Sequence, residues 1–407
     1  MIETIEHTIG KHALFDAASP ALLMVSGGSD STALAYIMAD LHARGLVGPL
    51  ACLHVNHKLR GRDAEDDQVF VAALAEALDI PFFCCEVDVA LLARETGGNV
   101  EAIGRQERYI AAREALESLC MHAAVPIAEG RIITAHTQDD RVENFYMRSI
   151  KGTGPGGFRS MLYRNGPVVR PLLDVSRAGL RCYLEERAAR GEVVVRDEQG
   201  ALWREDATNA HTDRFRSYVR HEIVPAAKAQ NPQLLDTLCR TMNLIADEDD
   251  FMESLAEDAL VNNAEQAEGY TLLLPSFGML ALPLKRRAIR SVLESLIGSE
   301  GRIESTSIEA VLQAFDEDGS PQSGYVVNIQ GDLAVSANKQ GVLIEPMARF
   351  RTRRKRAYRD FSINAFLRRT HGSTAGHSHQ HHLGIEFAAS KAAASRCRRP
   401  VPCVHPH

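Results

Sequence analysis

The residues Ser26-Gly27-Gly28-Ser29-Asp30-Ser31 join an apolar run, 21–25, to an amphipathic segment, 32–44. This order predicts a buried strand, a tight glycine turn and a helix. The backbone N–H groups at such a turn have no partner within the helix and carry the positive end of its dipole, so they form a cradle for phosphate. Glycine at two positions lets the backbone approach a ligand closely.

Asp30 is the unusual member of this turn. Because a bare carboxylate beside phosphate groups would repel them, we expect a divalent cation, Mg²⁺, to lie between the two. The turn is not a Walker A loop, since it contains no lysine. The alternative interpretation is a helix start without a ligand, because Ser and Asp are also common N-caps.

The first half of the chain alternates short apolar runs with longer amphipathic segments. The runs predict strands over 21–25, 50–55, 82–87 and 131–135, and the segments predict helices over 31–44, 64–78, 101–119 and 139–150. This alternation is typical of an α/β fold with a parallel sheet and helices on both faces. Ligands in such sheets bind at the carboxyl ends of the strands, where the glycine turn and His136 both lie.

The later part of the chain predicts further domains. We expect a nucleotide-binding domain over 1–223, with a strand-like run at 167–173 before a helix over 176–190, and then a mostly helical domain over 224–318. A short β segment over 319–348 contains a hairpin of 325–329 with 333–336 and a further strand at 343–344. The tail, 349–407, has little apolar periodicity, which predicts disorder.

This tail is also rich in basic residues, histidine and cysteine. Seven basic residues between 349 and 359 predict either an additional RNA contact or a solvated tail. The later histidines and cysteines suggest zinc binding as an alternative to disorder, but their spacing matches no defined ligand pattern.

Composition excludes several classes of protein. The formal net charge of −7 argues against a protein that coats nucleic acid, though not against a local basic patch. The eight cysteines form no Cys-x-x-Cys pair, as expected of reduced thiols. No apolar run reaches about 18 residues, and the N-terminus lacks the features of a signal peptide. We therefore expect a cytoplasmic protein with no membrane partner.

Two further segments carry polar residues at strand or helix positions. His54 lies near the end of the second predicted strand, a position suited to nucleotide contact or to a simple polar strand end. Glu101, Arg105, Arg108 and Tyr109 are spaced to share one helix face, which is also the spacing of a solvated ion-pair face.

Another segment begins at His136 and places Asp139, Asp140 and Glu143 in the first two turns of a helix. Carboxylates grouped in this way can bind Mg²⁺ or an amine, although Asp139 and Asp140 can also act only as helix caps. A glycine-rich stretch, 152–157, follows this helix and is suited to a mobile loop over a substrate.

Together these segments make the chain similar to the tRNA(Ile)-lysidine synthases, a family of PP-loop ATP pyrophosphatases. The resemblance extends from about residue 20 to about residue 345. It rests on the glycine turn, 54–57, 101–109, 136–143, Arg170-Pro171-Leu172-Leu173, 205–209, the arginine-rich stretch 214–220 and the basic helix 284–290. The chain departs from the family pattern at Thr137, where His is usual, and at Arg141, where Gln is usual.

The resemblance implies an enzyme that joins L-lysine to C2 of the wobble cytidine of a tRNA(Ile) with a CAU anticodon. ATP adenylates the C2 oxygen and releases pyrophosphate, and the lysine ε-amine then displaces AMP. The expected ATP-binding residues are Ser26, Gly27, Gly28, Ser29, Asp30, Ser31 and His54. The expected catalytic residues are Asp30, Asp139, Asp140, Glu143, His136 and Arg105, with Mg²⁺ at Asp30 and Asp139. The expected tRNA-binding residues are Arg214, Arg216, Arg220, Arg286, Arg287 and Arg290.

The sequence leaves several questions open within this chemistry. A carboxylate must hold the lysine ammonium, whose free pKa is about 10.4, and accept its proton. Asp139, Asp140 and Glu143 are candidates, and Glu101 is a further one. The oligomeric state is open between a monomer and a homodimer. Rival interpretations are another PP-loop enzyme that modifies tRNA or forms an amide, and a non-catalytic nucleotide- or RNA-binding module.

Overall fold

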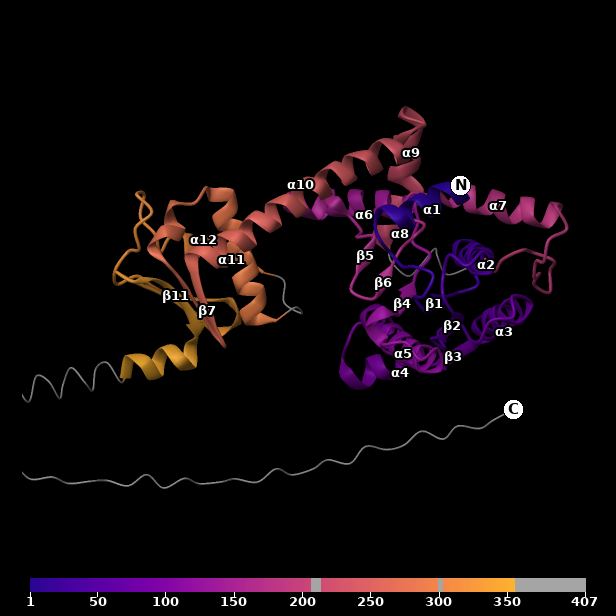
Figure 1. The fold of residues 1–407 in the computed structure, drawn as a ribbon, viewed down its shortest axis with the longest axis horizontal. Coiled ribbons are helices and arrows are strands. Elements are labelled where there is room, and N and C mark those ends of the chain that lie inside the picture. The colour runs from indigo at the N-terminus through magenta and orange to yellow at the C-terminus, as the bar shows by residue number, and fades with distance from the viewer. Residues whose placement is uncertain (206–213, 299–302, 356–407) are drawn as a thin grey trace, which may run out of the picture. The chain divides into compact units, whose positions relative to one another are not determined.

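The computed structural model describes residues 1–205, 214–298 and 303–355. Contacts divide the chain into two compact units (Figure 1): unit 1 comprises 1–262 with 280–291, and unit 2 comprises 263–279 with the residues from 292 onward. This division differs from the expected boundaries at 223 and 318. The reason is that α10 (Leu234–Asn263) bonds to unit 1 through side chains such as Asn243, which accepts from Arg141.

A six-stranded sheet in the order β3-β2-β1-β4-β6-β5 forms the centre of unit 1. Its strands are β1 (Ala21–Met24), β2 (Leu50–Asn56), β3 (Phe82–Glu86), β4 (Arg131–Ile133), β5 (Arg164–Asn165) and β6 (Val168–Val169). All neighbouring pairs are parallel except the short β5–β6 pair. The predicted parallel sheet is confirmed.

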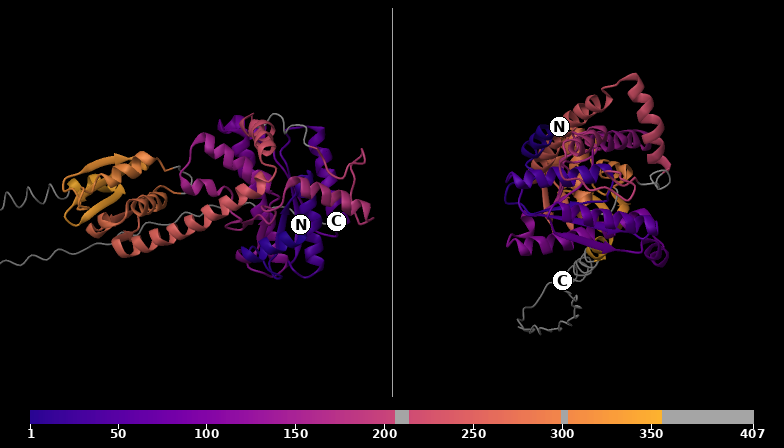
Figure 2. Two further views of the ribbon diagram at one scale, coloured as in Figure 1. Left: turned by 90° about the horizontal axis from the view of Figure 1, so that it is seen from above. Right: turned by 90° about the vertical axis from the view of Figure 1, so that its right-hand side faces the viewer.

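Helices cover both faces of this sheet, as the continuous apolar runs predict. Successive side chains of a strand point to opposite faces. Leu23 of β1 therefore packs with α2, α3 and α7, whereas Leu22 packs with α5. Figures 1 and 2 show these helices around the sheet. The helices of unit 1 are α1 (Ile2–Lys11), α2 (Ser29–Ala43), α3 (Arg62–Ala77), α4 (Val89–Thr96), α5 (Val100–His122), α6 (Gln138–Lys151), α7 (Arg177–Ala189), α8 (Arg214–Tyr218), α9 (Val224–Gln230) and α10.

The expected helices form close to their predicted ranges, and the chain adds α1 and α4, which the sequence analysis missed. The run at 167–173 was predicted as a strand, but only Val168–Val169 pairs. The strand stops there because residues 171–174 form a turn that starts at Pro171, which has no N–H to donate to a ladder.

Unit 2 contains a five-stranded antiparallel sheet in the order β7-β8-β11-β10-β9. Its strands are β7 (Ala264–Ala267), β8 (Tyr270–Leu273), β9 (Val326–Ile329), β10 (Leu333–Asn338) and β11 (Gly341–Pro346), and its helices are α12 (Ser305–Leu312) and the end of α11 (Leu282–Ile297). The predicted hairpin forms, with Ile329 opposite Leu333. The β7–β8 hairpin falls where helix was expected; β7 is mostly exposed, so its sequence lacks an apolar alternation that would reveal a strand.

The basic run that begins at residue 349 is described as far as residue 355, and residues 347–355 are helical. The Arg349 guanidinium lies 3.7 Å from the centre of the Tyr270 ring, and Arg353 donates to the buried Glu345 at 2.6 Å. These two arginines pack against unit 2 and are not part of a solvated tail. The rest of the predicted tail, with its histidines and its last two cysteines, lies outside the described residues.

Candidate active site

The glycine turn lies between β1 and α2, as predicted, and its backbone needs glycine. Gly27 has φ of 91°, a left-handed conformation that other residues rarely adopt, and Gly28 is the N-cap of α2. The Ser31 hydroxyl donates to the Gly28 carbonyl at 3.1 Å and accepts from the Ser26 N–H at 3.2 Å. These bonds fix the turn so that the first N–H groups of α2 face outward.

A second segment closes over this turn. The Arg204 N–H donates to the Gly27 carbonyl at 2.9 Å, and a Cβ placed on Gly27 would lie 3.4 Å from Arg204 Cγ. The Arg204 guanidinium is held in turn by Asp67 at 3.0 Å. Arg204 directly precedes the family motif at 205–209, of which residues from 206 lie outside the described part of the chain. The sequence analysis did not single out Arg204.

The turn lies where the strand order of the sheet reverses. From β1 the chain proceeds to β2 on one side, whereas β4 pairs with β1 on the other side. Open α/β sheets bind ligands in the crevice at such a switch point, outside the carboxyl ends of the strands. The segments after β1 and after β4, which contain Asp30 and His136, therefore flank one crevice.

His54 supports the turn from β2. Its ring Nδ1 lies 3.0 Å from the Val25 carbonyl, immediately before the turn, and burial lowers the pKa of the imidazole. The structure thus gives His54 a bond to the loop backbone. A direct contact with ATP stays a prediction.

At the start of α6, Asp140 acts in the cap of its own helix, whereas Asp139 bonds to the start of α7. Thr137 is the N-cap, and its N–H donates to the Asp140 carboxylate at 2.9 Å, which completes a capping box. Asp139 accepts the backbone N–H of Arg177, the first residue of α7, at 2.8 Å. Each of these two carboxylates has a second oxygen, which is not used in these bonds and contacts other side chains.

Arg177 connects the turn to this carboxylate group. Its Nε donates to Asp30 at 3.0 Å, one terminal nitrogen donates to Asp140 at 3.3 Å, and the other lies 3.6 Å from Glu143. With its backbone bond to Asp139, Arg177 contacts all four of the predicted catalytic carboxylates. The sequence analysis missed it, because only the fold brings the start of α7 to the glycine turn.

Two of the arginines predicted to bind tRNA also reach this group. Arg220 donates twice to Glu143, at 2.7 and 3.0 Å, and Arg216 donates to Asp140 at 2.9 Å and to Glu143 at 3.2 Å. Glu143 is 2% exposed, so its carboxylate is enclosed by cations. The structure therefore places Arg216 and Arg220 at the carboxylates, while their contact with tRNA stays a prediction.

Asp139 has a different partner from its neighbours. The Lys228 ammonium, from α9, lies 3.1 Å from Asp139 Oδ1. A primary ammonium, the group that a lysine substrate carries, is thus accommodated at this oxygen by the chain itself. Lys228 was not identified from sequence, because nothing in its neighbourhood on the chain marks it.

Burial and ion pairing act in opposite directions on the carboxylates. Burial raises the pKa of Asp30, although Arg177 opposes this effect. Burial also disfavours the charged form of Asp140, but the guanidinium groups of Arg177 and Arg216 and the bond from the Thr137 N–H outweigh it, so the pKa of Asp140 lies below its usual range. Asp140 is therefore ionised at neutral pH. For Asp30, Arg177 is the neighbour that favours the ionised form against the effect of burial.

His136 lies between the carboxylates and a group of arginines. Its Nδ1 is 2.9 Å from the Thr134 hydroxyl, and burial lowers the pKa of His136 to about 4. A neutral imidazole cannot supply the positive charge that we expected at the departing pyrophosphate. Arg105, which stacks 5.2 Å from the Tyr109 ring centre, and Arg170, which bonds to Tyr109, are the cations on this side.

The remaining predicted tRNA contacts lie on α11 and α8. Arg287 pairs with Asp249 at 2.5 Å and with Glu253 at 3.0 Å, whereas Arg286 and Arg290 are exposed. The side chain of Arg214 lies outside the described part of the structure. An arginine bound to two carboxylates of α10 is less available to phosphate than an exposed one, so Arg290 is the clearer candidate.

The predicted Mg²⁺ site can be tested against the donor set. Mg²⁺ at phosphate-transfer sites is held by one or two carboxylates together with substrate phosphates, and Asp30, in the first turn of α2, fits this mode. The Arg177 guanidinium joins Asp30 to Asp140, and the Arg177 backbone N–H bonds to Asp139, so a metal site shared by Asp30 and Asp139 stays a prediction. Within residues 1–205, 214–298 and 303–355, no three His, Cys, Asp or Glu side chains gather into a metal-binding group.

The departure from the family pattern at Arg141 has a structural counterpart. Arg141 is 1% exposed, and its guanidinium donates to Tyr163 at 2.8 Å, to Asp174 at 3.2 Å and to Asn243 at 2.7 Å. Asp174 also accepts from Thr8 of α1 at 2.8 Å. Arg141 therefore ties α6 to α1 and α10, and it fixes the helix that carries the carboxylates.

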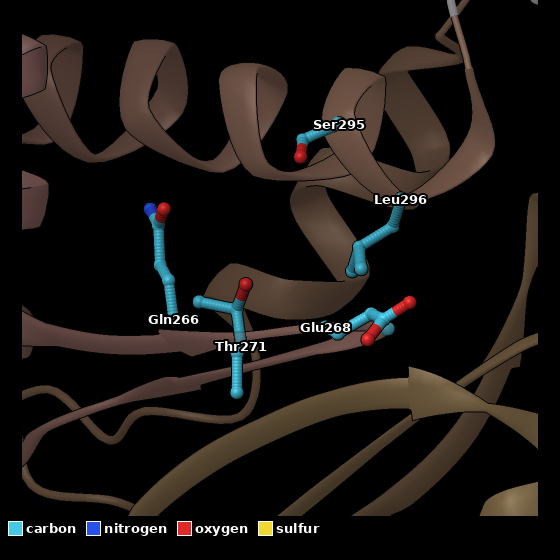
Figure 3. Close-up of a pocket in the computed structure, with 7 residues that line it drawn as sticks. Gln266, Glu268, Thr271, Ser295 and Leu296 are labelled. Carbon is cyan, nitrogen blue, oxygen red and sulfur yellow. The ribbon is translucent and has the colours of Figure 1, made fainter.

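Unit 2 contains a separate pocket of about 430 Å³ beside the β7–β8 turn and the end of α11 (Figure 3). It is lined by Gln266, Ala267, Glu268, Gly269, Thr271, Ser295 and Leu296. This described lining holds one carboxylate and no cation, so it does not suit a phosphate group. The chemistry expected from the sequence lies in unit 1.

Comparison with known proteins identifies the family of the first part of the chain. Residues 1–227 match the family model of the PP-loop domain. The chain is 35% identical over 283 residues to the tRNA(Ile)-lysidine synthase of Thermus thermophilus, which covers 68% of this chain and 49% of that protein. It is 30% identical over 305 residues to the tRNA(Ile)-lysidine synthase of Geobacter sulfurreducens, covering 74% and 60%.

The matched length and one solved structure complete the comparison. The chain spans about half the length of the Thermus relative. Among solved structures, it is similar to the U34-tRNA thiolase NcsA of Methanococcus maripaludis, with a TM-score of 0.45 and 15% identity over 60% of this chain and 78% of that one. Across the described helices, none is both long and apolar enough to cross a membrane.

Proposed function

The chain belongs to the PP-loop family, and from this membership we propose that it ligates L-lysine to C2 of the wobble cytidine of a CAU-anticodon tRNA(Ile) at the expense of ATP. Membership implies ATP binding. The observation that carries the rest is the convergence of the glycine turn and four carboxylates, Asp30, Asp139, Asp140 and Glu143, on Arg177.

The first step adenylates the C2 oxygen of cytidine, because this oxygen is a poor leaving group until it is activated. The N–H groups at the start of α2 bind the phosphates and stabilise the charge that develops on the departing pyrophosphate. Asp30, together with the phosphates, would hold Mg²⁺, which would supply positive charge against the charge that develops here. Arg105 and Arg170, which lie close enough to His136 to act on its charge, contribute further positive charge.

In the second step the lysine ε-amine displaces AMP from C2. The amine must lose a proton to act as a nucleophile, and we assign the acceptor to Asp139. Two observations support this choice: Asp140 and Glu143 are enclosed by arginines, whereas Asp139 Oδ1 already holds an ammonium, that of Lys228. The substrate amine then takes the place of Lys228.

The test is an assay with a tRNA(Ile) CAU transcript, ATP, Mg²⁺ and labelled lysine. We expect label in the tRNA together with one AMP for each lysine joined. AMP formed only with a different acceptor would exclude lysidine formation and favour another adenylating PP-loop enzyme. Binding of ATP and RNA without any AMP would favour a non-catalytic module.

Substitution of Asp30 separates catalysis from binding. Asp30→Ala is expected to abolish turnover, because the metal and its phosphate ligands lose their protein carboxylate, while affinity for tRNA stays close to that of the unmodified protein. Asp63→Ala, on the exposed face of α3, is the matched control and keeps both properties. A parallel loss of tRNA affinity in Asp30→Ala would show that Asp30 is structural.

A further inference from the structure

Arg177 holds a position that the proposed reaction does not yet use. Its three guanidinium nitrogens approach three different carboxylates, those of Asp30, Asp140 and Glu143, at 3.0, 3.3 and 3.6 Å. Its side chain is 22% exposed, so these contacts are largely shielded from water. Such a site is a junction between the turn that binds nucleotide and the helix that carries the other carboxylates.

The charges at this junction balance. Three carboxylates face three guanidinium groups, of Arg177, Arg216 and Arg220. Arg216 and Arg220 bind Asp140 and Glu143, whereas the cation that the structure pairs with Asp30 is Arg177. A largely buried carboxylate without a cation is costly, so Arg177 stabilises Asp30 in the nucleotide-free protein.

The same carboxylate is the one that fits Mg²⁺ brought in with ATP. A guanidinium and a divalent cation on the same oxygen of Asp30 would repel each other, because both carry positive charge. We propose that Arg177 is a positioning residue that occupies the site of the divalent cation in the nucleotide-free protein. There it keeps Asp30 and Asp140 oriented. When ATP binds, the guanidinium releases Asp30, which then binds the metal. This inference rests on the proposed function for the metal's role but concerns the protein without substrates.

If Arg177 occupies the metal site, its removal changes the affinity for a metal ion, whereas removal of a purely structural arginine does not. Without the guanidinium, a metal ion no longer competes with Arg177 for the Asp30 carboxylate. Arg177→Met is therefore expected to bind Mn²⁺, used as a spectroscopic probe in place of Mg²⁺, about tenfold more tightly than the unmodified protein in the absence of nucleotide. Turnover with ATP is expected to fall in the same variant, because the carboxylates are no longer oriented.

The matched control lies one helical turn further along α7. Arg181 also approaches the glycine turn, with Nε 3.5 Å from the Ser29 hydroxyl, and it stacks on Trp203 instead of binding a carboxylate of the junction. Arg181→Met is expected to leave Mn²⁺ affinity unchanged. The double variant Arg177→Met with Asp30→Asn is expected to lose the gain, since the oxygen that takes up the metal is then part of a neutral amide.

The experiment is Mn²⁺ titration of the full-length chain, followed by electron paramagnetic resonance, with thermal unfolding to verify that each variant is folded. If Arg177→Met does not fold, Arg177→Gln removes the charge but keeps hydrogen-bonding groups and gives the same test. Equal affinity in Arg177→Met and the unmodified protein overturns the inference, as does an equal gain in Arg181→Met. Because no RNA or lysine is present, failure of the lysine assay would not affect this result.

Discussion

At the scale of single residues, position in the fold decides the charge that each side chain carries. His136 would be half protonated near pH 6.5 in an open chain, yet its surroundings make it neutral down to about pH 4. Asp140 is deeply buried but ionised, because the guanidinium groups of Arg177 and Arg216 lie beside it. The candidate site thus combines a neutral base and ionised acids, and the chemical identity of the residues alone would not distinguish them.

The neutral state of His136 predicts how stability depends on pH. Between pH 6.5 and pH 4 the unfolded chain binds a proton at this residue and the folded protein does not, so the free energy of unfolding falls as the pH is lowered through this range. His136→Gln is expected to show a smaller fall between pH 7 and pH 5, measured by urea unfolding. His7→Gln, at an exposed position of α1, is the control; an equal change in both variants would contradict the assignment.

At the scale of elements, close approaches between helix and sheet fix the crevice. α5 covers one face of the sheet, and its Leu116 and Cys120 lie against the start of β4 at Gly130. A Cβ on Gly130 would lie 2.6 Å from Cys120 Sγ and 2.9 Å from a Leu116 methyl carbon. The glycine therefore sets how near α5 comes to the strand that leads to His136.

Gly130→Ala is expected to destabilise the protein by about 2 kcal/mol, because the added methyl group overpacks this contact. Gly10→Ala, in α1, is the matched control: no atom lies within 4 Å of its Cβ, and alanine favours helix by up to about 1 kcal/mol. Urea unfolding of both variants measures the difference. A Gly130→Ala protein as stable as the unmodified one would show that α5 can move away without cost.

At the scale of the whole molecule, charge must be distributed unevenly for this protein to bind RNA. The chain has a formal net charge of −7, so the proposed binding to tRNA requires local arginines. Several of these are engaged elsewhere in the structure: Arg216 and Arg220 bind Asp140 and Glu143, and Arg287 binds Asp249 and Glu253. Exposed cations such as Arg290 are left as the main candidates for phosphate contacts on α11.

Arg290→Ala is expected to weaken tRNA binding uniformly and to reduce the slope of log K against log salt by about 1, as for the loss of one phosphate contact. Arg287→Ala is expected instead to lower stability, because Asp249 and Glu253 lose their partner. Filter binding at several salt concentrations, paired with urea unfolding, separates the two effects. A larger change of slope in Arg287→Ala than in Arg290→Ala would reverse this assignment.

The sequence by itself determined the parallel sheet, the glycine turn and the carboxylates of α6, because each has a local pattern. Apolar runs indicate the strands, the strand–glycine–helix order indicates the turn, and close spacing on one helix groups the carboxylates. It did not predict the β7–β8 hairpin, since β7 is exposed and lacks alternation. It also could not find Arg177, Lys228 or Arg204. These residues reach the site from 147, 89 and 137 positions away from their partners Asp30, Asp139 and Asp67. Only tertiary packing creates such pairs, because the residues next to a charged side chain in the sequence do not indicate which distant residue will pair with it.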